Sequence, residues 1–387
     1  MNYRTLGKTG EKVSVLGFGC MRLPVIDGNM KDINVPDAIQ MIRHAVDQGV
    51  NYIDTAYTYH EGHCEGVVAK ALKDGYREKV FIATKLPVWN VNKHEDMAKL
   101  LDEQLNNLEI NCLDFYLVHS LNRKYWTKLK DLGLLDFLRM AKEKRKVKHL
   151  GFSFHDEFDV FKEIIDSFPW TFCQIQYNYL DESFQAGRKG LEYAAKQGLG
   201  IVIMEPLRGG VLANGLADGA KQVIEESSIK MKPAELALRW IWDHPEVGVV
   251  LSGMTEMDQV IANTQYAAYS DKPLGTEEKK VIDSIQRIYQ EKRLINCTAC
   301  KYCMPCPSGV DISQCFEYYN RAYMLDNVKA ARFWYNRISK ASNCTQCGHC
   351  ETHCPQNIAI IEKLKDVKEL FETKDEVQGP ASSSKRH

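Results

Sequence analysis

Short apolar runs alternate with amphipathic stretches through the first two-thirds of the chain. The runs are rich in Val, Ile, Leu and Phe and mostly continuous, which is typical of strands buried on both faces. Eight such runs are expected as strands: Val13–Gly17, Tyr52–Asp54, Val80–Thr84, Phe115–Val118, Leu150–Phe152, Cys173–Gln176, Ile201–Met204 and Gly248–Leu251.

Helical periodicity fills the intervals between these runs. Pro36 and Asp37 before the first helical stretch and Gly49 after it are boundary signals. The clearest stretches are Ala38–Gln48, Asp96–Leu108, Leu134–Lys142 and Ala234–Trp242. Eight strand–helix alternations predict an α/β fold of the (β/α)8 TIM barrel type. A doubly wound open sheet is the competing interpretation, but Gly17–Arg22 lacks the third glycine of its usual first turn.

The chain beyond the barrel follows a different pattern. We expect the barrel over residues 1–272 and a connecting helix over 273–293. Residues 294–360, with two cysteine runs separated by an aromatic helical segment, predict a small, mostly helical domain. Residues 361–387 are expected to form a charged helix and a Gly/Pro/Ser-rich, disordered tail.

Charge and composition exclude several classes of protein. Lys and Arg total 50 against 51 Asp and Glu, so a basic surface for nucleic acid or anionic lipid is not expected. The chain has no apolar run of about 18 residues for a membrane span. Its polar start, Met1–Gly10, lacks a signal core, which predicts a cytoplasmic protein. Nine of the 13 cysteines lie between Cys297 and Cys354, which indicates metal or redox chemistry rather than disulfides.

Four polar residues lie at or after consecutive strand ends, where barrel enzymes carry their catalytic groups. Asp54 ends the second strand, Tyr59 follows in its loop, Lys85 ends the third and His119 the fourth. We expect the Lys85 ammonium to lower the pKa of the Tyr59 phenol, with Asp54 orienting the ammonium. His119 would donate a hydrogen bond to a carbonyl oxygen that Tyr59 protonates. This set predicts carbonyl reduction by hydride transfer.

Each of these residues also has a plain structural interpretation. Asp54 could cap the following segment, Lys85 could be a solvated loop residue, and His119 could be a structural histidine. Tyr57 is a competing phenol two residues before Tyr59. The four residue types in this order favour the catalytic interpretation.

Several motifs resemble the aldo-keto reductase family over residues 3–268. They are Gly17-Phe-Gly19, Asp54-x4-Tyr59, Thr84-Lys85, Asp114-Phe-Tyr-Leu-Val-His119, Gly151-Phe-Ser153, Gln174-Ile-Gln-Tyr-Asn178 and Glu205-Pro-Leu-Arg-Gly-Gly210. The resemblance implies an Asp54–Tyr59–Lys85–His119 tetrad with Tyr59 as the general acid. It also implies a nicotinamide dinucleotide bound across the barrel top without a Rossmann motif.

The resemblance further implies that Ser153 and Gln174 hold the carboxamide of the nucleotide, and that Leu207, Gly209 and Gly210 line its pyrophosphate. The sequence departs from the family in three respects. Phe154 follows Ser153, where family members usually have Asn. Met204 stands where an aromatic ring usually stacks on the nicotinamide. Residues 251–259 have no basic side chain for a 2′-phosphate, so both NADPH and NADH stay open, and a flavin is a further candidate.

Two cysteine runs carry the second signal. Cys344, Cys347, Cys350 and Cys354, followed by Pro355, match the bacterial ferredoxin run. The earlier run, Cys297, Cys300, Cys303 and Cys306, is one residue shorter and resembles the dicluster ferredoxin tail of some aldo-keto reductases. In such folds the fourth cysteine of each run binds the other cluster. This predicts two 4Fe–4S clusters, one on Cys297, Cys300, Cys303 and Cys354 and the other on the remaining four. Two zinc sites are the alternative.

Three hypotheses for the function follow. In the first, the barrel reduces a small-molecule carbonyl with NAD(P)H, and the clusters are structural or regulatory. In the second, a flavin or other mediator links the clusters to the substrate in a reductase of an anaerobe. In the third, the chain is a non-catalytic electron carrier or redox sensor with a partner protein. Trp89 and Tyr57 as pocket walls suggest an apolar or aromatic carbonyl compound. Cys315, Cys20 and Cys64 are expected to be buried packing thiols.

Overall fold

The computed structural model describes residues 1–297, 303–354 and 356–373. The chain forms two compact units. The first comprises Met1–Leu216 and Glu226–Lys280, and the second comprises Ala217–Glu225 and the chain from Val281 onward. A short segment from within the barrel sequence therefore groups with the C-terminal unit, which boundaries drawn along the sequence did not anticipate.

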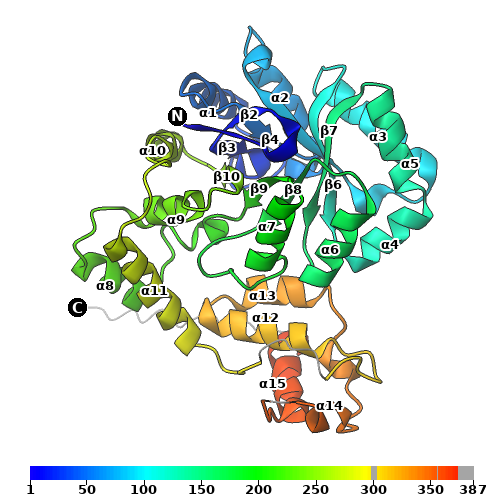
Figure 1. The fold of residues 1–387 in the computed structure, drawn as a ribbon, viewed down its shortest axis with the longest axis vertical. Helices are drawn as coiled ribbons and strands as arrows, with labels where there is room; N and C mark the ends of the chain where they lie inside the picture. The colour runs from blue at the N-terminus through cyan, green and yellow to red at the C-terminus, as the bar shows by residue number, and fades with distance from the viewer. Residues whose placement is uncertain (298–302, 355, 374–387) are drawn as a thin grey trace. The chain divides into compact units, whose positions relative to one another are not determined.

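The first unit contains a closed barrel of eight parallel strands, which confirms the predicted fold (Figure 1). Strands pair in chain order, and the last pairs with the first through Leu16 and Val250. The barrel strands are β3 (Leu16–Gly19), β4 (Tyr52–Asp54), β5 (Phe81–Leu86), β6 (Leu113–Leu121), β7 (Val147–Phe154), β8 (Phe172–Gln176), β9 (Gly200–Met204) and β10 (Val247–Gly253).

The prediction of a barrel strand over Val13–Gly17 is wrong in its N-terminal half. Lys12–Ser14 (β2) pairs antiparallel with Tyr3–Thr5 (β1) in a hairpin, and the barrel strand starts only at Leu16. Val13 is nevertheless fully buried, in the same cluster as the barrel-lining Val249 and Leu251. The hairpin and the barrel strands therefore both contribute apolar side chains to this core, so the apolar pattern alone cannot separate them.

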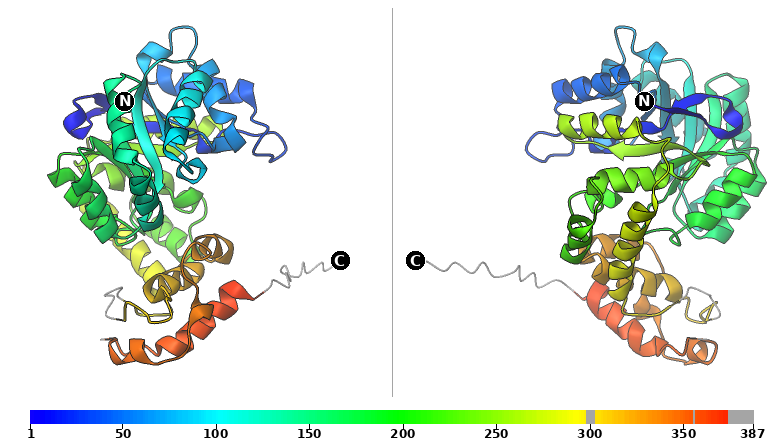
Figure 2. Two further views of the ribbon diagram at one scale, coloured as in Figure 1. Left: turned by 90° about the vertical axis from the view of Figure 1, so that its right-hand side faces the viewer. Right: turned by 60° about the vertical axis from the view of Figure 1, so that its left-hand side comes forward.

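Helices surround the strands, as the ribbon views show (Figure 2). The first of them is capped by Asn34, whose side chain accepts a hydrogen bond from Asp37 N, and it ends before Gly49, whose φ is +93°. The helices of this unit are α1 (Val35–Asp47), α2 (Cys64–Ala71), α3 (His94–Asn107), α4 (Arg123–Asp131), α5 (Leu134–Glu143), α6 (Phe158–Ser167), α7 (Gly187–Lys196), α9 (Pro233–Trp242) and α10 (Met257–Ala267).

The inner core of the barrel positions the site. Large side chains such as Tyr52, Phe115 and Phe172 fill the interior together with Leu6 from the hairpin loop. Buried residues nearer the C-terminal ends of the barrel strands include polar ones, among them Asp54, Lys85 and Gln174. The packed half of the barrel thus supports a polar layer at the end where the loops emerge.

The second unit is helical in its described part. The expected connecting helix is α11 (Thr276–Glu291), and the aromatic segment forms two helices, α12 (Ile312–Met324) and α13 (Val328–Tyr335). They are separated at Asp326, whose φ is +48°. The remaining helices are α8 (Asp218–Glu226), α14 (His349–Thr352) and α15 (Ile360–Glu372).

One buried amide organises the start of the cysteine region. Asn320, on α12, accepts hydrogen bonds from Leu294 N and Ile295 N at 3.0 and 2.8 Å, and donates one to Ile295 O at 2.8 Å. This ties the segment before Cys297 to α12. The tail expected to be disordered lies outside the described residues from 374 onward. Among the described helices, none is long and apolar enough to span a bilayer.

Candidate functional site

Lys85 is the centre of the polar layer. Its ammonium is fully buried and donates hydrogen bonds to Asp54 Oδ1 at 2.7 Å, Thr55 O at 2.8 Å and Tyr59 Oη at 3.1 Å. Three acceptors saturate the three N–H groups of the ammonium. Because the Tyr59 oxygen accepts from Lys85, the phenolic proton is directed elsewhere, and Tyr59 can donate it.

Strand register explains how these groups meet. Asp54 pairs with Ala83 across β4 and β5, which brings Lys85 above the end of β4. Behind Lys85 lies a buried polar network that the sequence did not lead us to expect. Gln104 Nε2 donates to Lys85 O at 3.0 Å and to Glu65 Oε1 at 2.9 Å. The sequence signal for this network was Glu65 in the apolar stretch of α2, because a buried acid needs hydrogen-bond partners.

The electrostatics of Tyr59 correct one expectation. Burial raises the pKa of Tyr59 to about 12, although the Lys85 ammonium acts to lower it. Desolvation of the phenolate outweighs the favourable charge of the ammonium. Burial likewise works against the charge of Lys85, but the Asp54 and Tyr59 oxygens outweigh it and raise the pKa of the ammonium. The site therefore holds a protonated phenol beside a protonated amine.

His119 lies on the last part of β6 and is 8 % exposed. Its ring faces Tyr59 edge-on at 6.1 Å between centroids, and Trp89 lies 5.0 Å away. Burial, followed by the nearby Lys85 and His155, lowers the pKa of His119 well below its usual value. A neutral imidazole suits hydrogen bonding to a carbonyl oxygen better than proton transfer.

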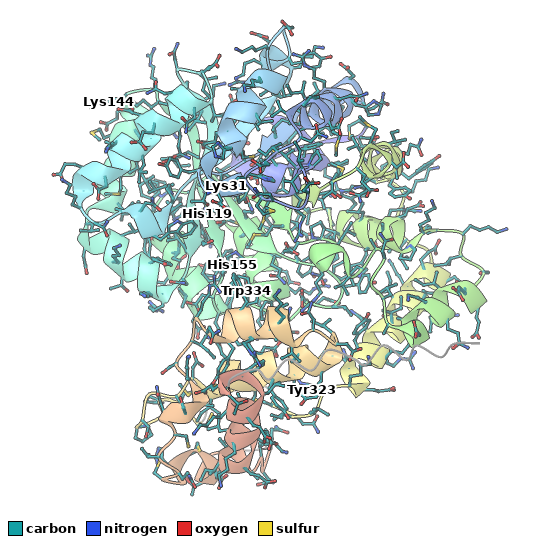
Figure 3. All side chains as sticks on the ribbon, turned by 180° about the vertical axis from the view of Figure 1, so that it is seen from behind. Lys31, His119, Lys144, His155, Tyr323 and Trp334 are labelled. Carbon is teal, nitrogen blue, oxygen red and sulfur yellow. The ribbon has the colours of Figure 1, made fainter. Side chains whose placement is uncertain are left out.

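His155 was not anticipated from the sequence. It follows β7 directly, and its Nδ1 lies 3.3 Å from Gln185 Oε1. His155 also acts electrostatically on His119, so the two imidazoles are neighbours (both are labelled in Figure 3). The alternation of side chains along β7 could have indicated it, because Gly151, Ser153 and His155 fall on one face of the strand.

The competing phenol has another partner. Tyr57 donates to Glu103 Oε2 at 3.1 Å, whereas Tyr59 contacts Lys85. The structure thus brings Asp54, Lys85 and Tyr59 into contact with one another, and His119 lies beside them.

The residues expected to hold a carboxamide also lie at this end of the barrel. Ser153 is buried and accepts a hydrogen bond from Ser120 N at 2.7 Å. Gln174 Nε2 contacts the Met204 sulfur at 3.5 Å. Gln174 Oε1 is buried and lacks a hydrogen-bond partner within the described part of the chain. An orphaned buried amide oxygen fits a site that receives an N–H donor from a ligand.

The loop after β9 has an unusual backbone. Gly209 and Gly210 have φ of +64° and +96°, and a side chain at Gly210 would meet open space. Arg208 forms an ion pair with the fully buried Asp181, and Asn178 Nδ2 donates to Glu205 O at 3.0 Å. These contacts fix a glycine turn whose backbone a ligand can approach closely.

Arg22 supplies a cation that was not expected from the sequence. It lies after β3, in contact with Gly253 at the end of β10 and close to Gly209. Its guanidinium is 3.6 Å from Glu205. The expected place for a basic side chain was residues 251–259, where the exposed Glu256 and Asp258 stand. Parallel strand ends meet in space, so the loop after the neighbouring strand also contributes to this part of the site.

In the second unit, four cysteines line one cavity: Cys306, Cys344, Cys347 and Cys350. Ser308 and Thr345 close one side of it and hydrogen-bond to each other at 2.7 Å. Three of the cysteines come from the second run and one from the first.

The other expected cluster ligands are partly outside the description. Cys297, Cys303 and Cys354 are half-buried, whereas Cys300 lies outside the described residues. Among the described residues, no three His, Cys, Asp or Glu side chains are close enough to hold one metal ion.

The three cysteines outside the runs that were expected to be buried are buried. Cys315 is buried, and burial raises the pKa of its thiol. Cys20 and Cys64 are also buried; Thr55 Oγ1 donates to the Cys64 sulfur at 3.2 Å. Burial raises the pKa of the Cys20 thiol well above its usual range, so it stays protonated.

Comparisons with known proteins agree with this geometry. The chain is 25% identical over 287 residues to L-galactose dehydrogenase of Arabidopsis thaliana (67% of this chain, 86% of the relative) and 24% identical over 330 residues to aldo-keto reductase YhdN of Bacillus subtilis (74% and 93%). The holo structure of aldo-keto reductase AKR11C1 from Bacillus halodurans matches with a TM-score of 0.62 and 26% identity, covering 74% of this chain and 96% of that one.

Family models account for both parts of the chain. Residues 296–359 match the 4Fe-4S dicluster domain, and residues 15–287 match the aldo/keto reductase family. This chain is an oxidoreductase that belongs to the aldo/keto reductase family and carries a C-terminal iron–sulfur domain.

Proposed function

We propose that the barrel reduces the carbonyl group of a small molecule to an alcohol. A nicotinamide dinucleotide, when bound, supplies the hydride that forms the new C–H bond. Tyr59 donates its phenolic proton to the carbonyl oxygen, so that the C=O π bond becomes C–H and O–H. His119 donates a hydrogen bond to the same oxygen and orients it. The tyrosinate is reprotonated from solvent.

The observation that carries this proposal is the contact between the fully buried Lys85 ammonium and Tyr59 Oη at 3.1 Å. A phenol with a pKa of about 12 is a weak acid, because negative charge develops on its buried oxygen when the proton leaves. The ammonium stabilises the tyrosinate as the proton departs. Asp54 holds the ammonium in place, and Trp89 forms an apolar wall beside His119. This wall favours an apolar or aromatic carbonyl compound.

The residues around the barrel top fit a nicotinamide dinucleotide. Ser153 and the orphaned Gln174 Oε1 would hold its carboxamide, and Met204 would lie against the ring. Leu207, Gly209 and Gly210 would line its pyrophosphate, with Arg22 as the neighbouring cation. Because Glu256 and Asp258 stand where a 2′-phosphate would need a partner, this arrangement favours NADH over NADPH.

Two 4Fe–4S clusters are proposed for the second unit. The cavity lined by Cys306, Cys344, Cys347 and Cys350 supports the crossed assignment, in which one thiolate comes from the first run. The ferredoxin-type spacing of the second run, followed by Pro355, favours a cluster over one zinc ion. Cys297, Cys300, Cys303 and Cys354 would hold the other cluster.

Replacing Tyr59 tests the barrel chemistry. Tyr59→Phe removes the donated proton, and we expect carbonyl reduction to fall about 10²- to 10⁴-fold with nucleotide affinity nearly unchanged. Tyr57→Phe is the matched control, since it keeps the ring and removes the same atom two residues away, where the hydroxyl donates to Glu103 at 3.1 Å. Steady-state assays with a panel of aromatic aldehydes and ketones give the rates. Equal activity in both variants would overturn the role of Tyr59.

A second candidate function is electron transfer between the clusters and the substrate through a flavin or other mediator. The observation that favours it is Met204, which leaves the expected ring-stacking position without an aromatic side chain. Anaerobic titration of the purified protein with NADH, and separately with NADPH, distinguishes the two. We expect cluster absorbance to stay constant while a carbonyl compound oxidises the nucleotide. Bleaching of the clusters, or a flavin released by acid, would support the mediator.

A further inference from the structure

The segment between β3 and α1 folds back on itself beside the nucleotide end of the site. Val25 and Ile33 form an antiparallel bridge, and Ile26 N donates to Asp32 O at 2.8 Å. Its third residue is Arg22, which lies beside Gly253 and close to Gly209. We call residues 20–34 the strap.

His60 fastens the strap. It is 3 % exposed, its Nε2 is 3.2 Å from Leu23 N, and its Nδ1 is 2.9 Å from Met30 O. A backbone N–H can only donate and a carbonyl oxygen can only accept. The ring is therefore the neutral tautomer with the proton on Nδ1, and it bridges both limbs of the strap.

The backbone around His60 is also constrained. His60 and Glu61 have φ of +51° and +53°, and Gly62 follows at +97°. Residues other than glycine adopt this region at a cost, and persist there only when surrounding contacts hold them. Lys31 of the strap adds an exposed ion pair to Glu61 at 3.0 Å (Lys31 is labelled in Figure 3). The turn that follows Tyr59 is thus held by the strap, just as the strap is held by the turn.

We infer that His60 is a positioning residue that couples the nucleotide side of the site to the general acid. One imidazole hydrogen-bonds the residue directly after Arg22, and it belongs to the residue directly after Tyr59. Losing either hydrogen bond loosens the segment that carries Arg22 and relaxes the turn that presents the phenol to Lys85. The role of His60 rests on the proposed function, because Tyr59 and Arg22 matter only if the barrel reduces a carbonyl with a bound nucleotide.

The alternative is a histidine that only stabilises the fold. A structural role would lower the midpoint of unfolding but leave the affinity for nucleotide and the turnover of the folded enzyme unchanged. A positioning role affects both, and the effect is local to residues 20–34. The two roles therefore differ in measurements made on the folded holoprotein.

Three variants of the full-length protein with its clusters separate these roles. His60→Phe keeps the ring but removes both hydrogen bonds. His60→Gln can restore an acceptor at the position of Nε2 and a donor beside it. Lys31→Met removes only the exposed ion pair and serves as the control. Each is compared by hydrogen exchange of the Leu23 amide, by NADH and NADPH affinity from quenching of tryptophan fluorescence, and by kcat for carbonyl reduction.

In His60→Phe we expect the Leu23 amide to lose its protection while amides in β5 and β6 keep theirs. We expect nucleotide affinity and kcat each to fall about tenfold, as for the loss of one buried hydrogen bond. His60→Gln should recover part of both losses, and Lys31→Met should stay within about twofold of the wild type. Unchanged affinity and kcat in a folded His60→Phe protein would overturn the inference.

Failure of the proposed function gives a different result. A wild-type protein that binds neither nucleotide and reduces no carbonyl would remove the catalytic role for any residue. In that case an unprotected Leu23 amide in His60→Phe would still show that His60 fastens the strap, whereas an unchanged amide would show that it does not.

Discussion

The polar layer of the barrel and the cysteine cavity of the second unit differ in how they are held. Lys85 is fully buried, with three protein oxygens within 3.1 Å. In the cavity, Cys350 is buried, Cys344 is half-buried and Cys347 is exposed. The barrel thus assembles its site from its own packing, whereas the cysteines line a space whose geometry depends on what binds there. Catalytic groups can be preorganised by a fold, but a cluster supplies part of the folding energy of its own site.

The largest effect expected from breaking the barrel side of this comparison comes from Lys85→Met. It leaves the Asp54 carboxylate buried without its counter-ion, and we expect about 3–5 kcal/mol loss in the free energy of unfolding of the barrel. Urea unfolding followed by tryptophan fluorescence measures it. The double variant with Asp54→Asn should recover most of the loss, because no uncompensated charge remains. A single variant as stable as the double would show that the pair is not buried as an ion pair.

Removing one cavity cysteine tests the other side of the comparison. Cys306→Ser should lose about half of the bound iron together with the order of the second unit, while the unfolding of the barrel is unchanged. Iron analysis and electron paramagnetic resonance of the reduced protein measure the loss. Cys315→Ser is the matched control, since this thiol lies outside both runs and should keep all the iron. Full iron content in Cys306→Ser would contradict the crossed assignment.

A titration sharpens the contrast from the barrel side. Because burial raises the pKa of Tyr59 from 10.0 to about 12, the folded protein keeps a proton that the unfolded chain loses. The resulting stabilisation is complete below pH 10 and declines as the pH rises toward 12. The unfolding free energy of the wild type should therefore fall more steeply above pH 10 than that of Tyr59→Phe. Parallel pH profiles for the two proteins would show that the phenol is not desolvated.

The smallest effect is expected at Arg22. Its ion pair with Glu205 is solvent-exposed, so Arg22→Gln should change the free energy of unfolding by less than about 1 kcal/mol. Nucleotide affinity should weaken severalfold, more at low salt than at high salt, because screening reduces the attraction between Arg22 and phosphate in the wild type. Fluorescence titration at two ionic strengths measures this. An effect independent of salt would place Arg22 away from the phosphates.

Much of the barrel was accessible from the sequence because its strands are buried on both faces, and such strands read as apolar runs. The runs located all eight barrel strands, and the polar residues at their ends located Asp54, Lys85 and His119. The predicted position of the first strand was displaced because Val13, which belongs to a neighbouring hairpin, is buried in the same core. Burial is a property of position in space, and the apolar pattern does not record which sheet a residue joins.

The missed residues share a different cause. Arg22, Gln104 and His155 act on groups far from them in sequence, and their partners are set by the closure of the barrel. The pKa of Tyr59 was expected to fall because its cationic neighbour could be inferred, whereas the depth of its burial could not. The ferredoxin-type spacing of the second cysteine run, in contrast, is local, so it could be recognised directly from the sequence.

The pairing of Leu16 with Val250 has a consequence for biosynthesis. The barrel cannot close until its last strand has left the ribosome, yet every residue of β3 to β10 emerges before the first cysteine of the iron–sulfur region. Domains generally fold as units during synthesis, with N-terminal units first. The reductase half can therefore be finished before iron is needed. Iron starvation would yield chains with a complete barrel and an immature C-terminal unit, and repair of that unit would not require remaking the barrel.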